Sequence, residues 1–194
     1  MRQKNMRKIK IGVSGGKGSF SEEAGNYYCA KNNIVNYELY YLETVENVLN
    51  FLENGKVDQG VFPIENSNGG IVLEAVYAMS RHNFQIKNIF EIDIKHQLLV
   101  LPARQKEEVK KIVSHPQVLK QCRMYLKRNW SQTELEEYPD TAGATKDLRE
   151  GKLNPHSAVI ASQICAKLYD LKILERDIQD LKFNFTSFIV VQKN

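Results

Sequence analysis

The segment that decides the fold is "FQIKNIFEIDIKHQLLVLP", residues 84–102. It holds two strand-like runs, 84–94 and 96–102, with no helix between them. On both sides of it, strand-like and helix-like stretches alternate, which is typical of α/β sheets with parallel strands. We therefore expect two α/β lobes, and we expect the chain to cross from one to the other at about 84–101.

The alternation before the crossover predicts the first lobe. Strands are expected at 9–15, 37–42 and 57–64, the last ended by Pro63. Helices are expected at 19–32, where Ser19 and Glu22 have the capping-box form, at 44–55, where Gly55 can end the helix, and at 70–82.

The pattern resumes after the crossover. Strands are expected at 109–115, 133–138 and 157–162, and helices after Pro116, at 140–151 and up to about Tyr169. A final strand at 185–192 is expected to return to the first lobe. Lobe 1 would cover about 8–84 plus 184–194, and lobe 2 about 95–175, with a ligand-binding cleft between them.

Composition narrows the class of protein. Of 194 residues, 42% are hydrophobic and 26% charged, as in soluble globular proteins. The net charge of +4 is spread along the chain, which favours small anions rather than nucleic acid. No apolar run approaches the ~20 residues that span a membrane. Cys29, Cys122 and Cys165 form no CxxC pair, which argues against zinc and for a reduced, cytoplasmic protein.

A glycine-rich segment, "GVSGGKGS" (12–19), joins a strand to a helix. The spacing of a P-loop fails, because Gly18 rather than Ser or Thr follows Lys17. Two interpretations remain: a tight connection, or an anion seat on the free N–H groups of the helix start.

The segment "PIENSNGG" (63–70) places Glu65, Asn66, Ser67 and Asn68 after a strand. Open α/β sheets bind ligands at the carboxyl ends of their strands. Ordinary turn chemistry would also explain these residue types.

Two further segments also lead into helices. In "SHPQVLKQC" (114–122), Gln117 and Gln121 lie four residues apart and so share a helix face. From spacing alone, an N-cap and two solvated glutamines are the favoured interpretation. In "DTAGA" (140–144), Asp140 or Thr141 as an N-cap is a sufficient explanation.

The order of these motifs resembles that of the prephenate dehydratase catalytic domain. The matching segments, from about Ile9 to Val191, are "GSFSEEA", "PIENSNGG", "SHPQVLKQC", "DTAGA", "AVIAS" and "NFTSF". The resemblance implies two α/β lobes with crossover strands around a central cleft, as in periplasmic binding proteins. It implies conversion of prephenate to phenylpyruvate, with loss of water and carbon dioxide, in phenylalanine biosynthesis. It implies no metal, no organic cofactor and a homodimer.

The resemblance also implies roles for individual residues. Thr186 would be catalytic, through a hydrogen bond to the leaving hydroxyl. The residues that would bind substrate are Asn66, Ser114 and Gln121, with Glu65 and Ser67 of the "IENS" turn and Thr141 of the "DTAGA" turn.

One departure from the family lies beside the catalytic position. Where the family usually has Thr-Arg-Phe, this chain has Thr186, Ser187 and Phe188. An arginine suits a carboxylate as a bidentate donor. If it faced the substrate, Ser187→Arg should lower KM. If Lys17, Arg176 or Lys182 replaces it, the added charge should be neutral or harmful.

A second departure concerns regulation. Many family members carry a phenylalanine-sensing ACT domain, and this sequence stops at Asn194. We expect a catalytic domain alone, without ACT-type control by phenylalanine.

Two alternatives to an active dehydratase stay open. One is a decarboxylase that releases a non-aromatic product from prephenate. The other is a non-catalytic, anion-binding module of the same fold. The presence of Thr186, Asn66, Ser114 and Gln121 favours the enzyme.

Overall fold

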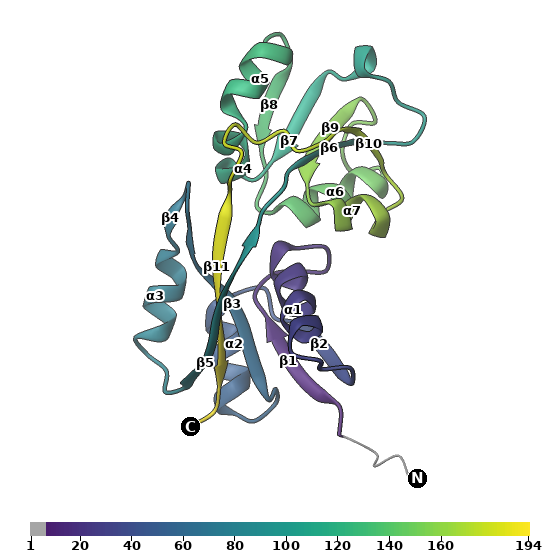
Figure 1. Ribbon diagram of the computed structural model, residues 1–194. Coiled ribbons are helices and arrows are strands. Elements are labelled where there is room, and N and C mark those ends of the chain that lie inside the picture. The colour runs from purple at the N-terminus through teal and green to yellow at the C-terminus, as the bar shows by residue number, and fades with distance from the viewer. Residues whose placement is uncertain (1–6) are drawn as a thin grey trace. The chain divides into compact units, whose positions relative to one another are not determined.

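The computed structural model describes residues 7–194 (Figure 1). The chain divides into two compact units, each with its own sheet. Unit 1 consists of Met1–Ile92 and Phe185–Asn194, and unit 2 of Asp93–Asn184. The lobe boundaries and the cleft expected from the sequence stay predictions.

Unit 1 is built on a mixed sheet with the strand order β2-β1-β3-β11-β5, to which β4 adds by pairing with β3. Its elements in chain order are β1 (Ile9–Val13), α1 (Phe20–Lys31), β2 (Tyr37–Tyr41), α2 (Val45–Glu53), β3 (Gln59–Asn66), β4 (Gly70–Ile71), α3 (Leu73–Met79), β5 (Gln85–Asp93) and β11 (Phe185–Gln192).

The direction of the strands follows their connections. β1 runs parallel to β2 and β3, to which helices connect it, as the alternation predicts. β11 comes from the far end of the chain and runs antiparallel to β3 (Figure 1). The last strand therefore lies inside the sheet of unit 1, between β3 and β5.

Helices cover both faces of this sheet. A side chain added at Gly25 of α1 would meet Val13 and Leu39, whereas one added at Gly12 of β1 would meet Val48 of α2. Residues 12 and 13 point to opposite faces of a strand, so α1 and α2 lie on opposite sides of the sheet. The buried core on the α2 side consists of Val45, Val48, Leu49, Leu52, Val57, Phe62, Ala75, Ala78, Ile189 and Val191.

Two sequence expectations in unit 1 are wrong. β3 does not end at Pro63 but continues to Asn66. β1 pairs no further than Val61, so Pro63 has only β11 beside it, at a register shift where a missing N–H is tolerated. The expected helix at 70–82 is shorter, because Gly70 and Ile71 form β4.

Unit 2 has a second mixed sheet, in the order β10-β6-β9-β7-β8. β7 is parallel to β8 and β9, and β6 is antiparallel to β9 and β10. The elements are β6 (Gln97–Val100), η1 (Lys106–Glu108), β7 (Lys111–Ser114), α4 (Pro116–Gln121), α5 (Arg123–Asn129), β8 (Glu134–Glu137), α6 (Thr141–Arg149), β9 (Ser157–Ala161), α7 (Gln163–Leu168) and β10 (Lys172–Glu175).

Both faces of the second sheet are buried. Leu98 of β6 and Ile160 of β9 pack with α4 and α5, whereas their neighbours Leu99 and Val159 pack with α6 and α7. A strand buried on both faces needs a nearly continuous apolar run, which explains "LLV" (98–100) in β6 and "AVIA" (158–161) in β9.

The helix expected after Pro116 is present but is divided into two helices, α4 and α5. Pro116 begins α4 as predicted, and Val118, Cys122 and Leu126 are buried together. The helix breaks at Cys122 because Asp180 caps a new one: its carboxylate accepts from the backbone N–H groups of Met124 and Tyr125, each at 2.7 Å.

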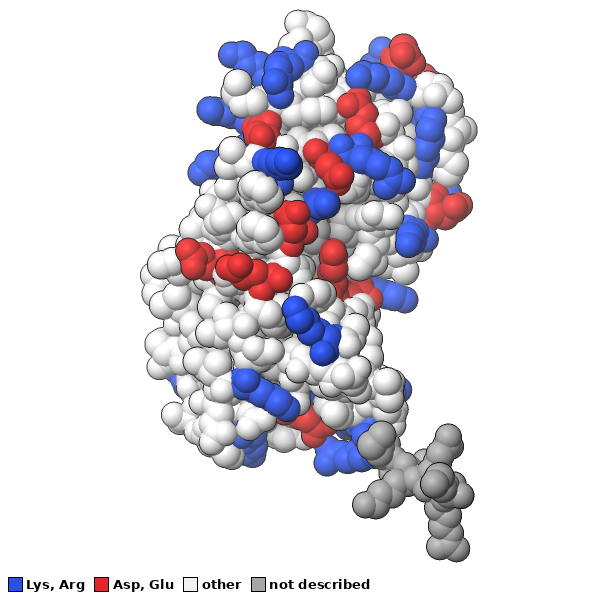
Figure 2. All heavy atoms as spheres, in the orientation of Figure 1, with Lys and Arg blue, Asp and Glu red and all other residues white. Residues whose placement is uncertain are grey.

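Gly55 and Gly151 follow α2 and α6 with φ angles of 67° and 75°. They end these helices as predicted. No helix between residues 7 and 194 is long and apolar enough to cross a membrane. On the face shown in Figure 2, lysine and arginine side chains are interspersed with acidic ones.

Candidate active site

Thr186 and Asn66 face each other across the pair β3–β11. They are partners in the register of the antiparallel ladder. The Asn66 side chain donates from Nδ2 to Thr186 Oγ1 at 2.9 Å and to the carbonyl of Phe185 at 3.2 Å. Thr186 is largely buried, at 8% exposure.

The turn after β3 fixes the orientation of the Asn66 amide. Asn66 Oδ1 accepts from the backbone N–H groups of Asn68 at 3.0 Å and Gly69 at 2.7 Å. An oxygen with two N–H donors cannot exchange places with the amide nitrogen. Asn66 is therefore the donor toward Thr186. The hydroxyl accepts this bond and keeps its own proton to donate.

Ser67 ties this turn to β11. Its backbone N–H donates to the carbonyl of Phe185 at 2.8 Å, and its Oγ accepts from the Phe185 N–H at 3.1 Å. Thus three of the predicted site residues, Asn66, Ser67 and Thr186, come together in unit 1.

Glu65 and Ser187 lie one position along the same strand pair. They are ladder partners, and adjacent residues of a strand point to opposite faces. Ser187 therefore points to the face opposite Thr186, and its hydroxyl donates to Glu91 Oε1 at 3.2 Å. An arginine at 187 would meet two carboxylates, Glu65 and Glu91, on this face, so the structure does not support a vacant substrate-carboxylate site there.

We predict that Ser187→Arg leaves KM for the substrate within about threefold of wild type, because the new side chain lies on the face opposite Thr186 and pairs with Glu91 and Glu65. An exposed charge pair of this kind is worth about 0.2–1 kcal/mol. A small rise in Tm is expected from pairing with Glu91 and Glu65. Steady-state kinetics and a thermal melt measure both, with Ser187→Gln as the uncharged control. A clear fall in KM confined to the arginine variant would return Ser187 to the binding site.

Gln121 lies at the end of α4 in unit 2 and is half-buried. Its Oε1 lies 2.6 Å from His96 Nε2 and accepts from Asn184 Nδ2 at 3.2 Å. His96 is 1% exposed. Burial lowers the pKa of His96, and this outweighs the opposing hydrogen bond to Gln121, so the imidazole is neutral at pH 7.

Ser114 and Thr141 also lie in unit 2. Ser114 is fully buried at the end of β7, and its hydroxyl donates to the carbonyl of Ile160 at 2.7 Å. Thr141 is the first residue of α6, whose N-cap is Asp140. The N-cap expected before Pro116 is His115, whose ring accepts from the backbone N–H of Gln117.

The glycine-rich segment 12–19 binds a carboxylate of the same chain, that of Glu22. The backbone N–H of Gly18 donates to the Glu22 carboxylate, and Ser19 Oγ accepts from the backbone N–H of Glu22. Ser19 is the N-cap, as predicted, but Glu22 reaches back to Gly18. This favours a tight strand-to-helix connection over a seat for an external anion.

The sequence analysis missed His96 and Asn184. His96 lies in the helix-free crossover between Lys95 and Gln97, where no motif or spacing marks it as a site residue. Asn184 directly precedes "FTSF", but no spacing rule relates it to Gln121, which lies 63 residues earlier.

Comparison with solved structures defines the class of fold. A prephenate dehydratase from Arthrobacter aurescens in complex with L-Phe aligns with a TM-score of 0.86 at 22% identity, over 96% of this chain and 60% of that one. An ABC-transporter periplasmic substrate-binding protein from Coxiella burnetii aligns with a TM-score of 0.51 at 13% identity, over 95% of this chain and 84% of that one. The chain thus has the mixed α/β, periplasmic-binding-protein-like fold that the sequence predicted.

Sequence comparison defines the family. The family model described as prephenate dehydratase matches residues 11–194. Arogenate dehydratase/prephenate dehydratase 2 of Arabidopsis thaliana is 32% identical over 189 residues, which are 97% of this chain and 48% of the relative. The chain belongs to the prephenate dehydratase family. It spans about half the length of the relatives it matches.

Proposed function

We propose that the protein is an active prephenate dehydratase, which converts prephenate to phenylpyruvate with loss of water and carbon dioxide in L-phenylalanine biosynthesis. The observation that carries this proposal is the Asn66–Thr186 hydrogen bond at 2.9 Å, because it leaves the Thr186 proton to donate. Family membership supports the choice of reaction.

The reaction needs little from the protein beyond position and hydrogen bonds. The bond between the ring and its carboxylate breaks, and carbon dioxide leaves. The electron pair moves into the ring, the carbon–oxygen bond opposite breaks, and the departing hydroxide takes a proton to become water. Aromatisation drives these steps. A hydroxyl that donates to the departing oxygen stabilises charge that develops mainly in the transition state.

We assign to Thr186 the hydrogen bond to the departing oxygen. Asn66 would be the residue that orients the Thr186 hydroxyl. Gln121, Ser114, Ser67 and Thr141 would bind or surround the substrate, whereas Glu65 lies on the face opposite Thr186 and is not assigned to it. Gln121 has the clearest chemistry for this, because an amide N–H can donate to a carboxylate or keto oxygen without charge. No metal or organic cofactor enters these steps.

Two substrates that differ in one functional group, prephenate and arogenate, have to be distinguished. The Arabidopsis relative bears the names of both an arogenate and a prephenate dehydratase. Arogenate carries an amine where prephenate carries a keto oxygen, so it requires an acceptor or a carboxylate at that position. We propose prephenate as the main substrate, because Gln121 Oε1 is already engaged by His96 and Asn184.

A product assay tests the proposed function. Purified protein is incubated with prephenate and, separately, with arogenate, and the products are identified by chromatography and mass spectrometry. Phenylpyruvate from prephenate is the expected result. A non-aromatic dihydro product would replace the dehydratase with a decarboxylase, and binding without turnover would replace it with an anion-binding module.

The role of Asn66 gives a second prediction. Asn66→Asp keeps the acceptor for the N–H groups of Asn68 and Gly69 but turns a second acceptor toward Thr186. The Thr186 hydroxyl should then donate to this carboxylate, and kcat should fall about tenfold, as for a lost or diverted hydrogen bond. An unchanged kcat in a variant with wild-type circular dichroism would remove Asn66 from this role.

We also infer a homodimer in the cytoplasm. The family resemblance supports the dimer. The cytoplasmic location is supported by the three cysteines, Cys29, Cys122 and Cys165, which are free and buried. Light scattering on a size-exclusion column tests the dimer, and fractionation of the producing cells tests the location.

A further inference from the structure

β5 (Gln85–Asp93) is an edge strand of the sheet of unit 1 that carries exposed apolar side chains. It lies beside β11 and stands last in the strand order of the described residues (Figure 1). Ile86 and Ile89 are 58% and 54% exposed. Another strand can add to such an edge, and natural proteins protect their edges with charges, bulges or a covering element.

The edge strand β8 of unit 2 shows what a protected edge looks like in this chain. Its sequence is "ELEE" (134–137), so a second copy of the strand would meet it with like charges. β5 carries charges of opposite sign instead. Lys87 and Glu91 are both exposed, and they lie two residues before and two residues after Ile89.

We propose that β5 is an interface between two copies of this chain, which pair their β5 strands antiparallel about Ile89. In a two-fold arrangement, residues before Ile89 in one copy lie opposite residues after it in the other. Ile89 then meets Ile89 of the partner subunit, and each Lys87 meets the partner's Glu91. The strand is thus complementary to itself in charge. The inference gives the inferred homodimer a surface and does not depend on the proposed activity.

Lys87, Ile89 and Glu91 lie on one face of the sheet, because alternate residues of a strand point the same way. The Glu91 carboxylate accepts from the Ser187 hydroxyl at 3.2 Å. Ser187 shares its face of β11 with Ile189, which is buried in the same cluster as residues of α3. The two charged residues and Ile89 therefore lie on the face of the sheet that α3 covers.

α3 adds apolar side chains to this surface. Leu73, Val76 and Tyr77 are 61%, 41% and 62% exposed. Glu74 marks the side of α3 that faces α2, because its carboxylate accepts from the backbone N–H of Val45 at 2.9 Å. Val76, two residues further on, points to the other side of the helix, away from α2. A second copy paired with β5 would find apolar contacts there beside the strand, with Lys and Glu pairs around them.

Charge reversal tests both the surface and its register. Lys87→Glu places a carboxylate opposite Glu91 at both ends of the pairing, and Glu91→Lys places an ammonium group opposite Lys87. Each variant alone should raise the Kd of the dimer about ten- to a hundredfold, because like charges directly opposite each other repel. An equimolar mixture of the two should restore the dimer, since only the mixed pair has opposite charges at both positions. Sedimentation velocity over a dilution series measures these Kd values.

Two further variants complete the test. Ile89→Asp brings two carboxylates together at the two-fold axis and should give a monomer. Glu38→Lys lies on β2, at the opposite edge of the same sheet, and should leave Kd unchanged. Circular dichroism and Tm show whether each variant is folded. If Ile89→Asp does not fold, the two charge variants still decide, because both positions are exposed.

A wild-type protein that stays monomeric at every concentration would overturn the interface. So would a dimer whose Kd is unaffected by all three substitutions in β5. Loss of the dimer in both charge variants without recovery in their mixture would overturn the pairing about Ile89. Turnover of prephenate is assayed on the same samples: a dimer that depends on β5 but has no turnover would refute the dehydratase and leave the interface standing, whereas turnover by a monomer would do the reverse.

Discussion

Thr186→Val should lower kcat for prephenate by about 10²- to 10³-fold, the cost of removing one donor from a developing oxyanion. Valine keeps the shape of threonine and removes only the hydroxyl. KM should change little, because the bond to the leaving oxygen strengthens mainly in the transition state. Thr186→Ala should show the same pattern.

The matched control is Thr186→Ser, which keeps a hydroxyl that Asn66 can orient. It should retain most of the wild-type kcat, in contrast to valine. Single-turnover measurements confirm that chemistry rather than product release is compared. If the valine variant turned over at nearly the wild-type rate, Thr186 would have no part in the mechanism.

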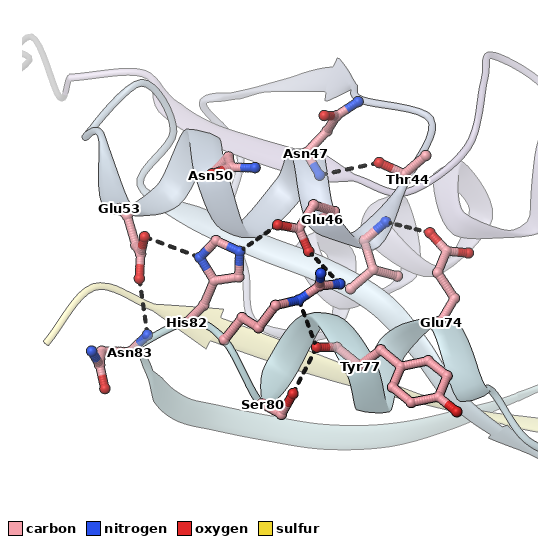
Figure 3. Close-up of polar contacts among 12 residues, drawn as sticks. Thr44, Glu46, Asn47, Asn50, Glu53, Glu74, Tyr77, Ser80, His82 and Asn83 are labelled. Atoms are coloured by element: carbon pink, nitrogen blue, oxygen red, sulfur yellow. Dashed lines mark hydrogen bonds and ion pairs between the residues drawn. The ribbon is translucent and has the colours of Figure 1, made fainter.

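The second large effect concerns stability and depends on His82. The His82 ring lies between two carboxylates of α2, with Nε2 3.1 Å from Glu46 and Nδ1 3.0 Å from Glu53 (Figure 3). Its side chain is 7% exposed. Arg81 also pairs with Glu46, at 3.2 Å, and the backbone N–H of Asn83 donates to Glu53 at 2.9 Å. The three residues after Ser80 are thus fastened to one helix.

Charge on His82 stabilises this cluster. Burial is the largest single influence and opposes protonation, but the hydrogen bonds and charges of Glu46 and Glu53 together outweigh it, so the pKa of His82 is raised above the ordinary 6.5. A raised pKa in the folded state means that the stabilisation is complete below pH 6.5 and is lost as the pH rises through the folded pKa. The other charges near the ring are Arg81 on Glu46 and Lys193, which acts on Glu53.

His82→Gln should therefore lower the free energy of unfolding by about 1.5–3 kcal/mol at pH 6, the range for hydrogen bonds to charged groups. The loss should shrink as the pH is raised, because the wild type loses its imidazolium as well. Urea unfolding of both proteins from pH 5.5 to 9 measures the difference. A difference that does not vary with pH would show that His82 stabilises the fold as a neutral side chain. His156→Gln, at a histidine outside this cluster, is the control.

The sequence predicted the fold well where local rules decide it. Pro116 begins a helix, Asp140 and Ser19 cap others, and Gly55 and Gly151 end two more, all through contacts within a few residues. The alternation could not give the direction of β11, because direction depends on which strand it joins. It also missed β10, whose partner β6 lies more than 70 residues earlier in the chain.

In the predicted site, too, features that depend on neighbouring residues could be predicted, and features that depend on distant residues could not. The turn at 66–69 was visible as polar residues after a strand, but the Asn66–Thr186 bond joins residues 120 positions apart. Asp180 caps a new helix after Cys122 by accepting from the backbone N–H groups of Met124 and Tyr125, which lie 56 and 55 residues earlier. Pro63 stays inside a strand because only one side of that strand is paired there. Each of these depends on tertiary contacts that no local pattern encodes.

The place of β11 inside the first sheet sets the order in which the protein can fold on the ribosome. Unit 2 is continuous in sequence, so all of its strands have been made before residues 185–192 emerge. It can fold while synthesis continues. The first sheet, although its other strands are translated earlier, must wait with a gap between β3 and β5. Thr186 lies in β11, the strand that fills this gap. The nascent chain therefore acquires its proposed catalytic hydroxyl in the same step that completes the sheet of unit 1.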